Sequence, residues 1–194
     1  IGFREDRFEE EEQTPIIKVE EKPKLIFEYT ESIFDEVCEN CFAQYTTDKG
    51  TPIKKWDNVS TTLKDIDTTQ LHYVKVPENH IVIDFDIPDD SGEKSLERNL
   101  EEAAKWPPTY GELSKSGKGV HLHYIYTGDP TKLSSVYSDH IEIKVYSGKS
   151  SLRRMLTKCN DLPIANISSG LPLKGEDKVV NFDAIKTEKG LRTL

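Results

Sequence analysis

The sequence is poor in residues that cross-link a chain or carry it across a membrane. It contains three cysteines, one methionine and two tryptophans among 194 residues, and none of its apolar runs reaches membrane-spanning length. An odd number of cysteines without a framework spacing argues against a disulfide-stapled secreted domain and favours a reducing compartment. The first residues, Ile1-Gly2-Phe3-Arg4, lack the features of a signal peptide. We therefore expect a soluble, cytoplasmic protein without a membrane partner.

Negative charge predominates along the chain. Thirty-five Asp and Glu residues stand against 26 Lys and Arg, which gives a formal net charge of −9. This balance argues against broad, non-specific adhesion to nucleic acid, although bound cations and local basic loops can reverse the sign within one cleft. With 35% hydrophobic and 31% charged residues, the composition is polar but globular.

The chain divides into an acidic arm and one domain of two lobes. Residues 1–14 contain the run Glu9-Glu10-Glu11-Glu12, which indicates a solvated arm. Residues 15–194 are long enough for a single well-packed domain, with an N-terminal αβ lobe over 15–76 and a second lobe over 77–194. The absence of an initiator methionine suggests an excised fragment, so we expect further domains outside it.

Periodicity and turn signals predict an α+β fold. Helices are expected over residues 30–45, 91–105 and 152–156, and strands over residues 16–19, 25–27, 71–76, 80–87, 120–126, 140–146, 164–172 and 179–182. The first helix would begin at the N-cap Thr30 and bury Cys38 and Cys41 on its apolar stripe. The Cys-x-x-Cys spacing could instead form half of a zinc site, but no second pair follows.

The strand predicted over residues 80–87 carries two carboxylates inside an apolar, β-branched run. Alternation places Asp84 and Asp86 on the same face, opposite the side of Ile81, Ile83 and Phe85. Two neighbouring carboxylates repel each other, and a divalent cation relieves the repulsion most simply. Hard oxygen ligands suit Mg²⁺ or Mn²⁺. A strand end that simply enters solvent is the alternative.

Two further strands present polar faces. His121 and His123 share one face of the strand over 120–126, and Glu142 and Lys144 share one face of the strand over 140–146. If these strands are neighbours of the Asp84 strand, the polar side chains form one patch while the apolar faces pack on helices.

Two glycine-containing loops adjoin these strands. Ser116-Gly117-Lys118-Gly119 is a basic, glycine-rich loop that leads directly into the strand of His121. Gly148-Lys149-Ser150 is similar to the end of a P-loop, but Ile143 occupies the position where a Walker motif requires glycine, so a Walker site is not predicted. Backbone amides after this turn could still bind a phosphate.

In combination, the pieces Ile83-Asp84-Phe85-Asp86, Ser116-Gly117-Lys118-Gly119-Val120-His121 and Ile141-Glu142-Ile143 form a known pattern. Their order resembles the archaeo-eukaryotic primase superfamily, specifically the primase-polymerases of bacteriophages and plasmids, over roughly residues 75–175. The family pattern is Ser-x-His, whereas Gly119 occupies the serine position here, so a hydroxyl contact would have to come from Ser116.

The resemblance implies a fold, an activity and a set of site residues. The fold would be an RRM-like sheet module packed with an N-terminal αβ module, with the active site between them. The activity would be template-directed nucleotidyl transfer from dNTPs or NTPs, with DNA template and primer as partners. A helicase or accessory domain would lie outside this fragment, and a phage-encoded chain would work in the host cytoplasm.

By the same resemblance, Asp84, Asp86 and Glu142 would be the catalytic residues and hold two Mg²⁺ or Mn²⁺ ions. The Ser116–Gly119 loop and His121 would contact the phosphates of the incoming nucleotide. Lys118, Lys144, Arg153 and Arg154 are candidates for further charge on phosphates or template.

Two other readings use the same residues. His121-Leu122-His123 is also the His-hydrophobic-His metal motif of rolling-circle nickases, which need a nucleophilic tyrosine such as Tyr137 or Tyr146. That reading leaves the Asp84 and Asp86 pair unexplained. A non-catalytic RRM-like nucleic-acid-binding module is the second alternative, and it predicts exposed aromatic side chains on the middle strands.

Overall fold

The computed structural model describes residues 25–175. The fold is α+β with mostly antiparallel sheets and few helices, which confirms the predicted class. The acidic arm over 1–14 and the strands expected over 16–19 and 179–182 lie outside the described residues.

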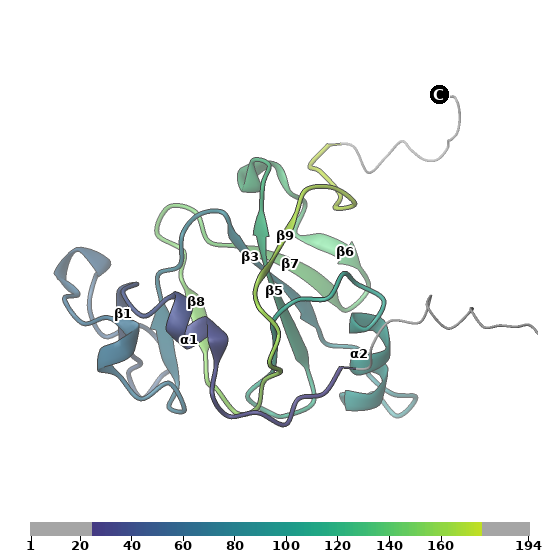
Figure 1. The fold of residues 1–194 in the computed structure, drawn as a ribbon, viewed down its shortest axis with the longest axis horizontal. Helices are drawn as coiled ribbons and strands as arrows, with labels where there is room; N and C mark the ends of the chain where they lie inside the picture. The colour runs from purple at the N-terminus through teal and green to yellow at the C-terminus, as the bar shows by residue number, and fades with distance from the viewer. Residues whose placement is uncertain (1–24, 176–194) are drawn as a thin grey trace, which may run out of the picture.

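A large sheet forms the centre of the molecule (Figure 1). Its strands run in the order β4 (Gly111–Leu113), β5 (Val120–Tyr126), β3 (His80–Phe85), β7 (Ile141–Val145) and β6 (Val136–Ser138). These neighbours pair antiparallel, and β9 (Ala165–Ile167) adds a parallel pairing to β5. The predicted strands over 80–87, 120–126 and 140–146 are therefore confirmed, and they are neighbours.

One face of the large sheet is apolar because every second residue of its central strands is large and hydrophobic. Ile81, Ile83 and Phe85 of β3 pack with Val120 and Leu122 of β5 into a core cluster. The helix α2 (Leu96–Ala103) covers this face through Leu96, Leu100 and Ala103. It is shorter than the predicted 91–105 because it begins at the N-cap Ser95, whose side chain accepts from the amide of Arg98.

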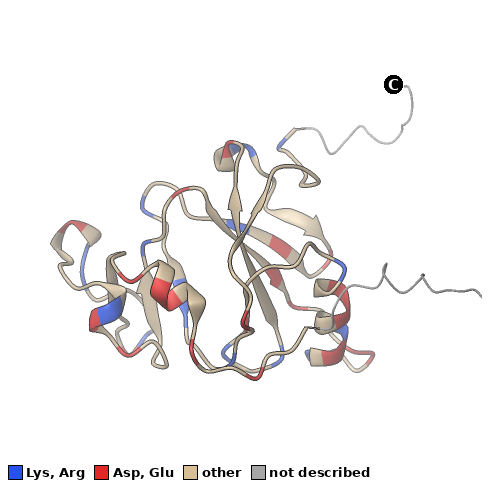
Figure 2. Cartoon of the chain, in the orientation of Figure 1, with Lys and Arg blue, Asp and Glu red and all other residues tan. Residues whose placement is uncertain are grey.

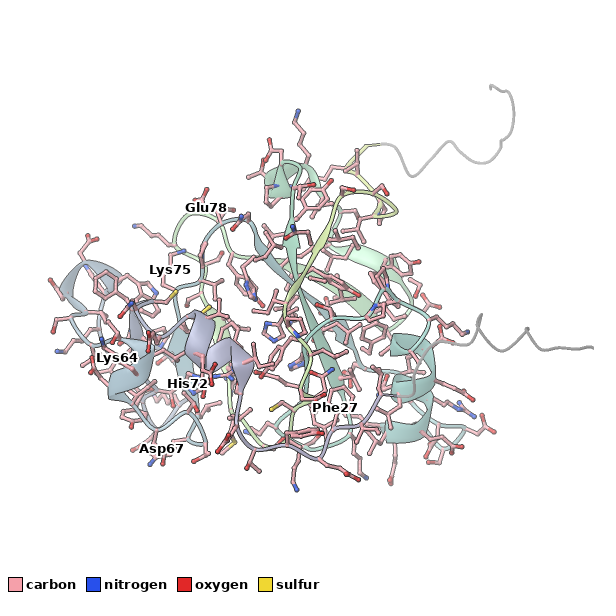
Figure 3. All side chains as sticks on the ribbon, in the orientation of Figure 1. Phe27, Lys64, Asp67, His72, Lys75 and Glu78 are labelled. Atoms are coloured by element: carbon pink, nitrogen blue, oxygen red, sulfur yellow. The ribbon has the colours of Figure 1, made fainter. Side chains whose placement is uncertain are left out.

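A smaller sheet covers part of the opposite face. It consists of β1 (Ala43–Tyr45), β2 (His72–Val74) and β8 (Leu152–Arg154), in the order β1-β2-β8. Together with the helix α1 (Ile33–Val37) it forms a second core cluster. This cluster contains Phe34, Val74, Leu152, Val82 and Tyr110. Side chains fill the space between the small sheet and the large one, where His72 lies (Figure 3).

Two predicted helices are wrong. The helix expected over 30–45 is only α1 (Ile33–Val37), whose N-cap is Ser32 rather than Thr30 and whose C-cap is Cys38. Residues 43–45 instead pair with β2, so a tertiary contact overrides the local apolar stripe. The helix expected over 152–156 is the strand β8, because its backbone pairs with β2.

Two further details differ from the expectations. Residues 25–27, predicted as a strand, lie outside named strands, and Tyr29 forms an isolated bridge with Cys159. The lobes also do not separate at residue 76, because the small sheet takes its third strand from 152–154. Short 3₁₀ turns at Trp56–Asn58, Leu63–Asp65 and Pro130–Lys132 complete the described elements.

Acidic residues lie on both helices, and acidic and basic residues both occur on the central strands of the large sheet (Figure 2). Among the helices within residues 25–175, none has the length and apolar character needed to cross a membrane.

Candidate functional site

The pairing of the central strands places the predicted polar residues in one row. Asp84 of β3 lies directly opposite His121 of β5 on one side and Glu142 of β7 on the other. Lys144 stands two residues beyond Glu142 on the same face. The expected convergence of Asp84, His121, Glu142 and Lys144 on one sheet face is therefore observed.

Asp84 is held between a histidine and a lysine side chain. Its Oδ1 lies 3.2 Å from His121 Nε2, and its Oδ2 lies 3.3 Å from Lys144 Nζ. Burial by itself would raise the pKa of Asp84, but the hydrogen bond and charge of His121, together with Lys144, outweigh burial and hold this pKa below its usual value. Asp84 is therefore ionised at neutral pH.

Asp86 follows β3 and shares an acidic hollow with Asp84. The hollow measures about 460 Å³, and the residues that line it are Asp84, Asp86, Val136, Ser138, Asp139, His140 and Glu142. The amide of Asp86 donates to the carbonyl of His140, and its carboxylate lies 3.4 Å from Lys94 Nζ. Asp139 is a fourth carboxylate at this site, and sequence reasoning missed it because it lies in a turn outside the alternating strands.

Hard oxygen donors are therefore concentrated on one face, which is the ligand chemistry that Mg²⁺ and Mn²⁺ prefer. Within residues 25–175, no three Asp, Glu, His or Cys side chains already surround a common point as a metal group. The carboxylates of Asp84 and Asp86 instead contact Lys144 and Lys94. The donor set fits a divalent cation once these lysines move, since both lysine side chains are about half exposed.

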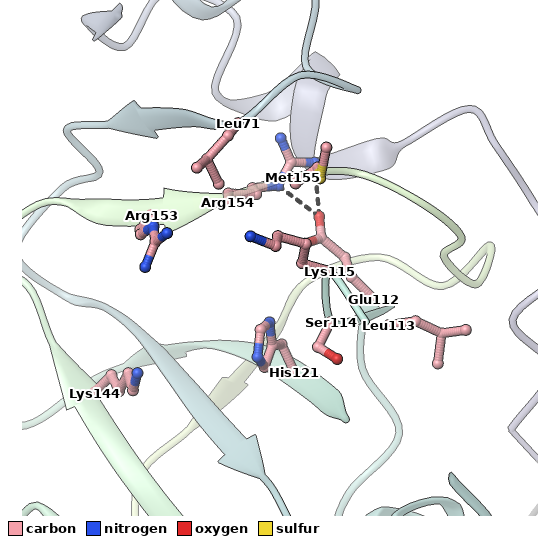
Figure 4. Close-up of a pocket in the computed structure, with 10 residues that line it drawn as sticks. All are labelled: Leu71, Glu112, Leu113, Ser114, Lys115, His121, Lys144, Arg153, Arg154 and Met155. Atoms are coloured by element: carbon pink, nitrogen blue, oxygen red, sulfur yellow. Dashed lines mark hydrogen bonds and ion pairs between the residues drawn. The ribbon is translucent and has the colours of Figure 1, made fainter. Parts of the chain in front are cut away.

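A second hollow of about 280 Å³ lies beside the acidic one and is rich in basic groups (Figure 4). Lys115, His121, Lys144 and Arg153 surround it, from the loop before β5, from β5, from β7 and from β8. Asp84 links the two hollows, because it lines the acidic one and binds His121 and Lys144 of the basic one. We call these two spaces the acidic hollow and the basic hollow.

The glycine-rich loop contributes Ser114 and Lys115 to the basic hollow, and not the residues first expected. Lys118 is exposed and does not line the hollow, while its carbonyl accepts from Asn99 Nδ2. Ser116 Oγ lies 3.1 Å from Ser114 Oγ. Lys115 therefore takes the place of Lys118 as the lysine of this loop at the basic hollow.

The two glycines of this loop have structural roles. Gly117 has a φ of 81°, a conformation that other residues adopt only with strain. A Cβ on Gly119 would lie 3.0 Å from Ser114 Oγ and 3.2 Å from the carbonyl oxygen of Phe85. The absence of a side chain at Gly119 therefore lets the loop close against the end of β3.

Arg154 requires a correction, because its guanidinium is buried and already paired. Its Nη2 lies 2.6 Å from Glu112 Oε2 and 2.7 Å from Asp35 Oδ1. An arginine neutralised by two carboxylates is a poor ligand for phosphate. Its neighbour Arg153 alternates to the exposed side of β8 and keeps the predicted access to the hollow.

His123 is also buried, and it does not join the polar face at Asp84. Its Nδ1 lies 2.8 Å from His80 Nε2, and its Nε2 lies 3.6 Å from Glu112 Oε1. Burial lowers the pKa of His123 and lowers that of His80 well below the usual value. The pair is a neutral interior contact at pH 7.

Cys38 and Cys41 lie close to each other at the end of α1. A hydrogen bond between the two thiols raises the pKa of Cys38 and lowers that of Cys41 to about 7, although partial burial opposes the shift at Cys41. All three cysteines are free. Zinc binding by this pair stays a hypothesis.

Comparison with protein-family models and with curated proteins finds no match to this chain.

Proposed function

We propose that this chain is the catalytic domain of a DNA primase-polymerase, a nucleotidyltransferase that joins (d)NTPs to a primer on a DNA template. The observation that carries the proposal is the position of Asp84. It stands opposite Glu142 in the acidic hollow and contacts His121 and Lys144 of the basic hollow. The finer fold assignment, an RRM-like sheet module packed with a smaller αβ module, belongs to the same proposal.

The acidic hollow supports the metal-dependent half of this chemistry. Asp84, Asp86 and Glu142 would hold two Mg²⁺ or Mn²⁺ ions, and Asp139 lies beside them. Such ions lower the pKa of an attacking hydroxyl and neutralise charge on transferring phosphates. The ionised state of Asp84 at neutral pH makes it available as an oxygen ligand.

The basic hollow supports binding of the triphosphate. Lys115 and Lys144 carry ammonium groups, Arg153 offers a planar fork of donors, and His121 offers a ring nitrogen at the side of Asp84. Three cations and a histidine around one space suit the oxygens of a polyphosphate. A nucleotide bound there would present its phosphates to the acids, because Asp84 connects the two spaces.

Two observations weigh against the alternatives. A nickase would use His121 and His123 together on one metal, yet His123 is 1% exposed and contacts His80. An RRM-like binding module would stack bases on exposed aromatic side chains of the middle strands. The aromatic residues of β3 and β5, Phe85, Tyr124 and Tyr126, are instead buried.

Primer extension tests the proposal. The protein is incubated with a primed template, dNTPs and Mg²⁺ or Mn²⁺, beside an unprimed template with NTPs and a labelled single strand for nicking. We expect metal-dependent extension of the primed template, abolished in Asp84→Asn. Lys118→Ala serves as the matched control, because Lys118 lies outside both hollows. Absence of synthesis on both templates would refute the proposal, and a covalent tyrosine–DNA adduct would favour the nickase.

A further inference from the structure

Glu112 and Arg154 form a buried ion pair between the two sheets. Arg154 Nε and Nη2 lie 2.8 Å and 2.6 Å from the same oxygen, Oε2 of Glu112. The two residues are only 2% and 4% exposed. Glu112 belongs to β4, the edge strand of the large sheet, and Arg154 belongs to β8, the edge strand of the small sheet.

The remaining polar atoms of Arg154 are occupied by partners in the small lobe. Nη1 lies 3.2 Å from His72 Nε2, and Nη2 also donates to Ser32 Oγ at 3.2 Å and contacts Asp35. The guanidinium carbon stands 4.4 Å from the centroid of the Phe34 ring. The guanidinium is thus fixed in its plane by groups from α1, the α1 N-cap and β2.

Glu112 is held equally firmly from the large sheet. The hydroxyl of Tyr110 donates to Oε2 at 2.6 Å, and His123 Nε2 faces Oε1 at 3.6 Å. Burial would raise the pKa of Glu112, but Arg154 and His123 hold it well below its usual value. Glu112 is therefore an ionised carboxylate, fixed by its contacts inside the protein.

The pair adjoins both walls of the basic hollow. Glu112 lies directly opposite His121 in the pairing of β4 with β5, and Arg154 follows Arg153 in β8. Both side chains also form part of the lining of the hollow, where dashed lines mark their contact (Figure 4). A shift of either member would move one wall relative to the other.

Stability alone does not account for this arrangement. A buried ion pair generally stabilises a fold no better than apolar residues of the same volume, while its fork geometry is strongly directional. The described ladders pair β4 with β5 and β8 with β2. Among the described residues, backbone contact between the two edge regions comes only after β8 has ended, where Cys159 bridges Glu112. The side-chain pair adds a directional link at Arg154, within β8 itself.

We propose that Glu112 and Arg154 are positioning residues that set the width of the basic hollow. By fixing β8 relative to β4, which pairs with β5, the pair holds Arg153 at the same hollow as His121 and Lys144. The pair acts indirectly, because the Arg154 guanidinium is already engaged by Glu112 and Asp35. The catalytic consequence rests on the proposed function, whereas the effect on anion binding does not.

Tripolyphosphate binding measured by calorimetry tests the proposal without any synthesis. Glu112→Gln keeps the shape of the side chain but removes its charge, and Arg154→Lys keeps the charge but removes the planar fork. Val76→Ala is the matched control, because Val76 belongs to the core between the sheets and does not line the hollow. Each protein is measured at a temperature where its thermal unfolding curve shows it folded.

Glu112→Gln and Arg154→Lys should each bind tripolyphosphate about tenfold or more weakly, since small misplacements of binding groups have large effects. The KM for the incoming nucleotide should rise by a similar factor, and kcat should change less. Val76→Ala should match the wild type in both readouts. Two variants are used so that failure of one to fold still leaves a measurement.

The outcomes separate the two proposals. If Glu112→Gln and Arg154→Lys both bind tripolyphosphate as tightly as the wild type, or if Val76→Ala loses as much affinity as they do, the positioning role is overturned. Absence of tripolyphosphate binding by the wild type would overturn it as well. If the wild-type protein binds tripolyphosphate but extends no primer, the proposed polymerase activity is rejected. The binding measurements on the variants still test the positioning role in that case.

Discussion

Asp84 and Glu142 face each other across the antiparallel pair of β3 and β7. Like charges directly opposite in a sheet destabilise it by roughly 0.2–1 kcal/mol, so this placement works against the fold. A cation between the two strands would reverse the sign of the interaction. We therefore expect this pair to destabilise the metal-free fold and to bind a cation at the site.

The first prediction concerns Glu142→Gln. Primer extension should fall by at least about a hundredfold, because even partners behind a metal ligand are worth up to that factor. The free energy of unfolding, measured with urea, should stay level or rise by a few tenths of a kcal/mol as the repulsion disappears. Extension near the wild-type rate would contradict the assignment of Glu142 as a metal ligand.

The second prediction compares two lysines three residues apart in one loop. Lys115 lines the basic hollow and Lys118 does not. Lys115→Ala should raise the KM for the incoming nucleotide about tenfold, since a charge-assisted contact to phosphate contributes roughly 1.5–3 kcal/mol. Lys118→Ala should leave the KM unchanged. The KM of each variant is measured by steady-state kinetics at varied dNTP concentration. A larger rise in KM for Lys118→Ala than for Lys115→Ala would show that the triphosphate does not bind in the basic hollow.

The third prediction separates the two histidines of β5. His121→Ala should weaken nucleotide binding and change the free energy of unfolding by less than about 1 kcal/mol, because the side chain is partly exposed. His123→Ala should reduce that free energy by about 1–3 kcal/mol, since it leaves a cavity and an unpaired His80. Urea titration and nucleotide titration measure the two effects. If both variants instead lose metal binding, and keep their stability and nucleotide binding, the result favours a nickase with His121 and His123 as metal ligands.

The fourth prediction concerns stability against pH. Burial lowers the pKa values of His72, His80 and His123 below 6.5, so the unfolded chain binds more protons than the folded one when the pH drops below about 6.5. The free energy of unfolding should therefore be level from pH 8 to 7 and fall between pH 6.5 and 5. Each histidine adds at most about 1.4 kcal/mol per pH unit to this slope.

Glu112 acts in a different range from the histidines. Its lowered pKa stabilises the fold above about pH 4.5, and that contribution is lost only as the pH falls further toward the folded pKa. Replacing His80 by Gln should therefore flatten the slope between pH 6.5 and 5 without moving the loss below pH 4.5. An unchanged slope in that variant would show that His80 is not one of the groups responsible.

The central strands were predictable because their side chains alternate strictly. In 80–85 and 120–126 every second residue is large and apolar, so sequence alone indicates the face that carries Asp84 and His121. The pairing that brings Glu142 opposite Asp84 requires only that three such strands be neighbours. This part of the site follows from the two-residue alternation of the side chains and from the order of the strands in the sheet.

The small sheet and the buried network could not be predicted in the same way. β1, β2 and β8 have three residues each, too few to show a period, and β1 and β8 pair with β2 from distant parts of the chain. The apolar spacing of Phe34, Cys38 and Phe42 fits a helix, yet Phe42 ends half exposed beside β1. Arg154 shows the same limit, because only its distant partner Glu112 reveals that it is buried.

The return of the chain to the small sheet at Leu152–Arg154 limits how this architecture can diversify. Recombination that exchanged residues 25–76 for a foreign segment would import two strands and leave the third behind. The foreign segment would have to pair with β8 as β2 does, with a residue opposite Arg154 in the place of His72, and would also have to accommodate the charge of Arg154. New specificities are therefore expected to arise by variation of surface loops, such as residues 46–55, and not by shuffling of lobes.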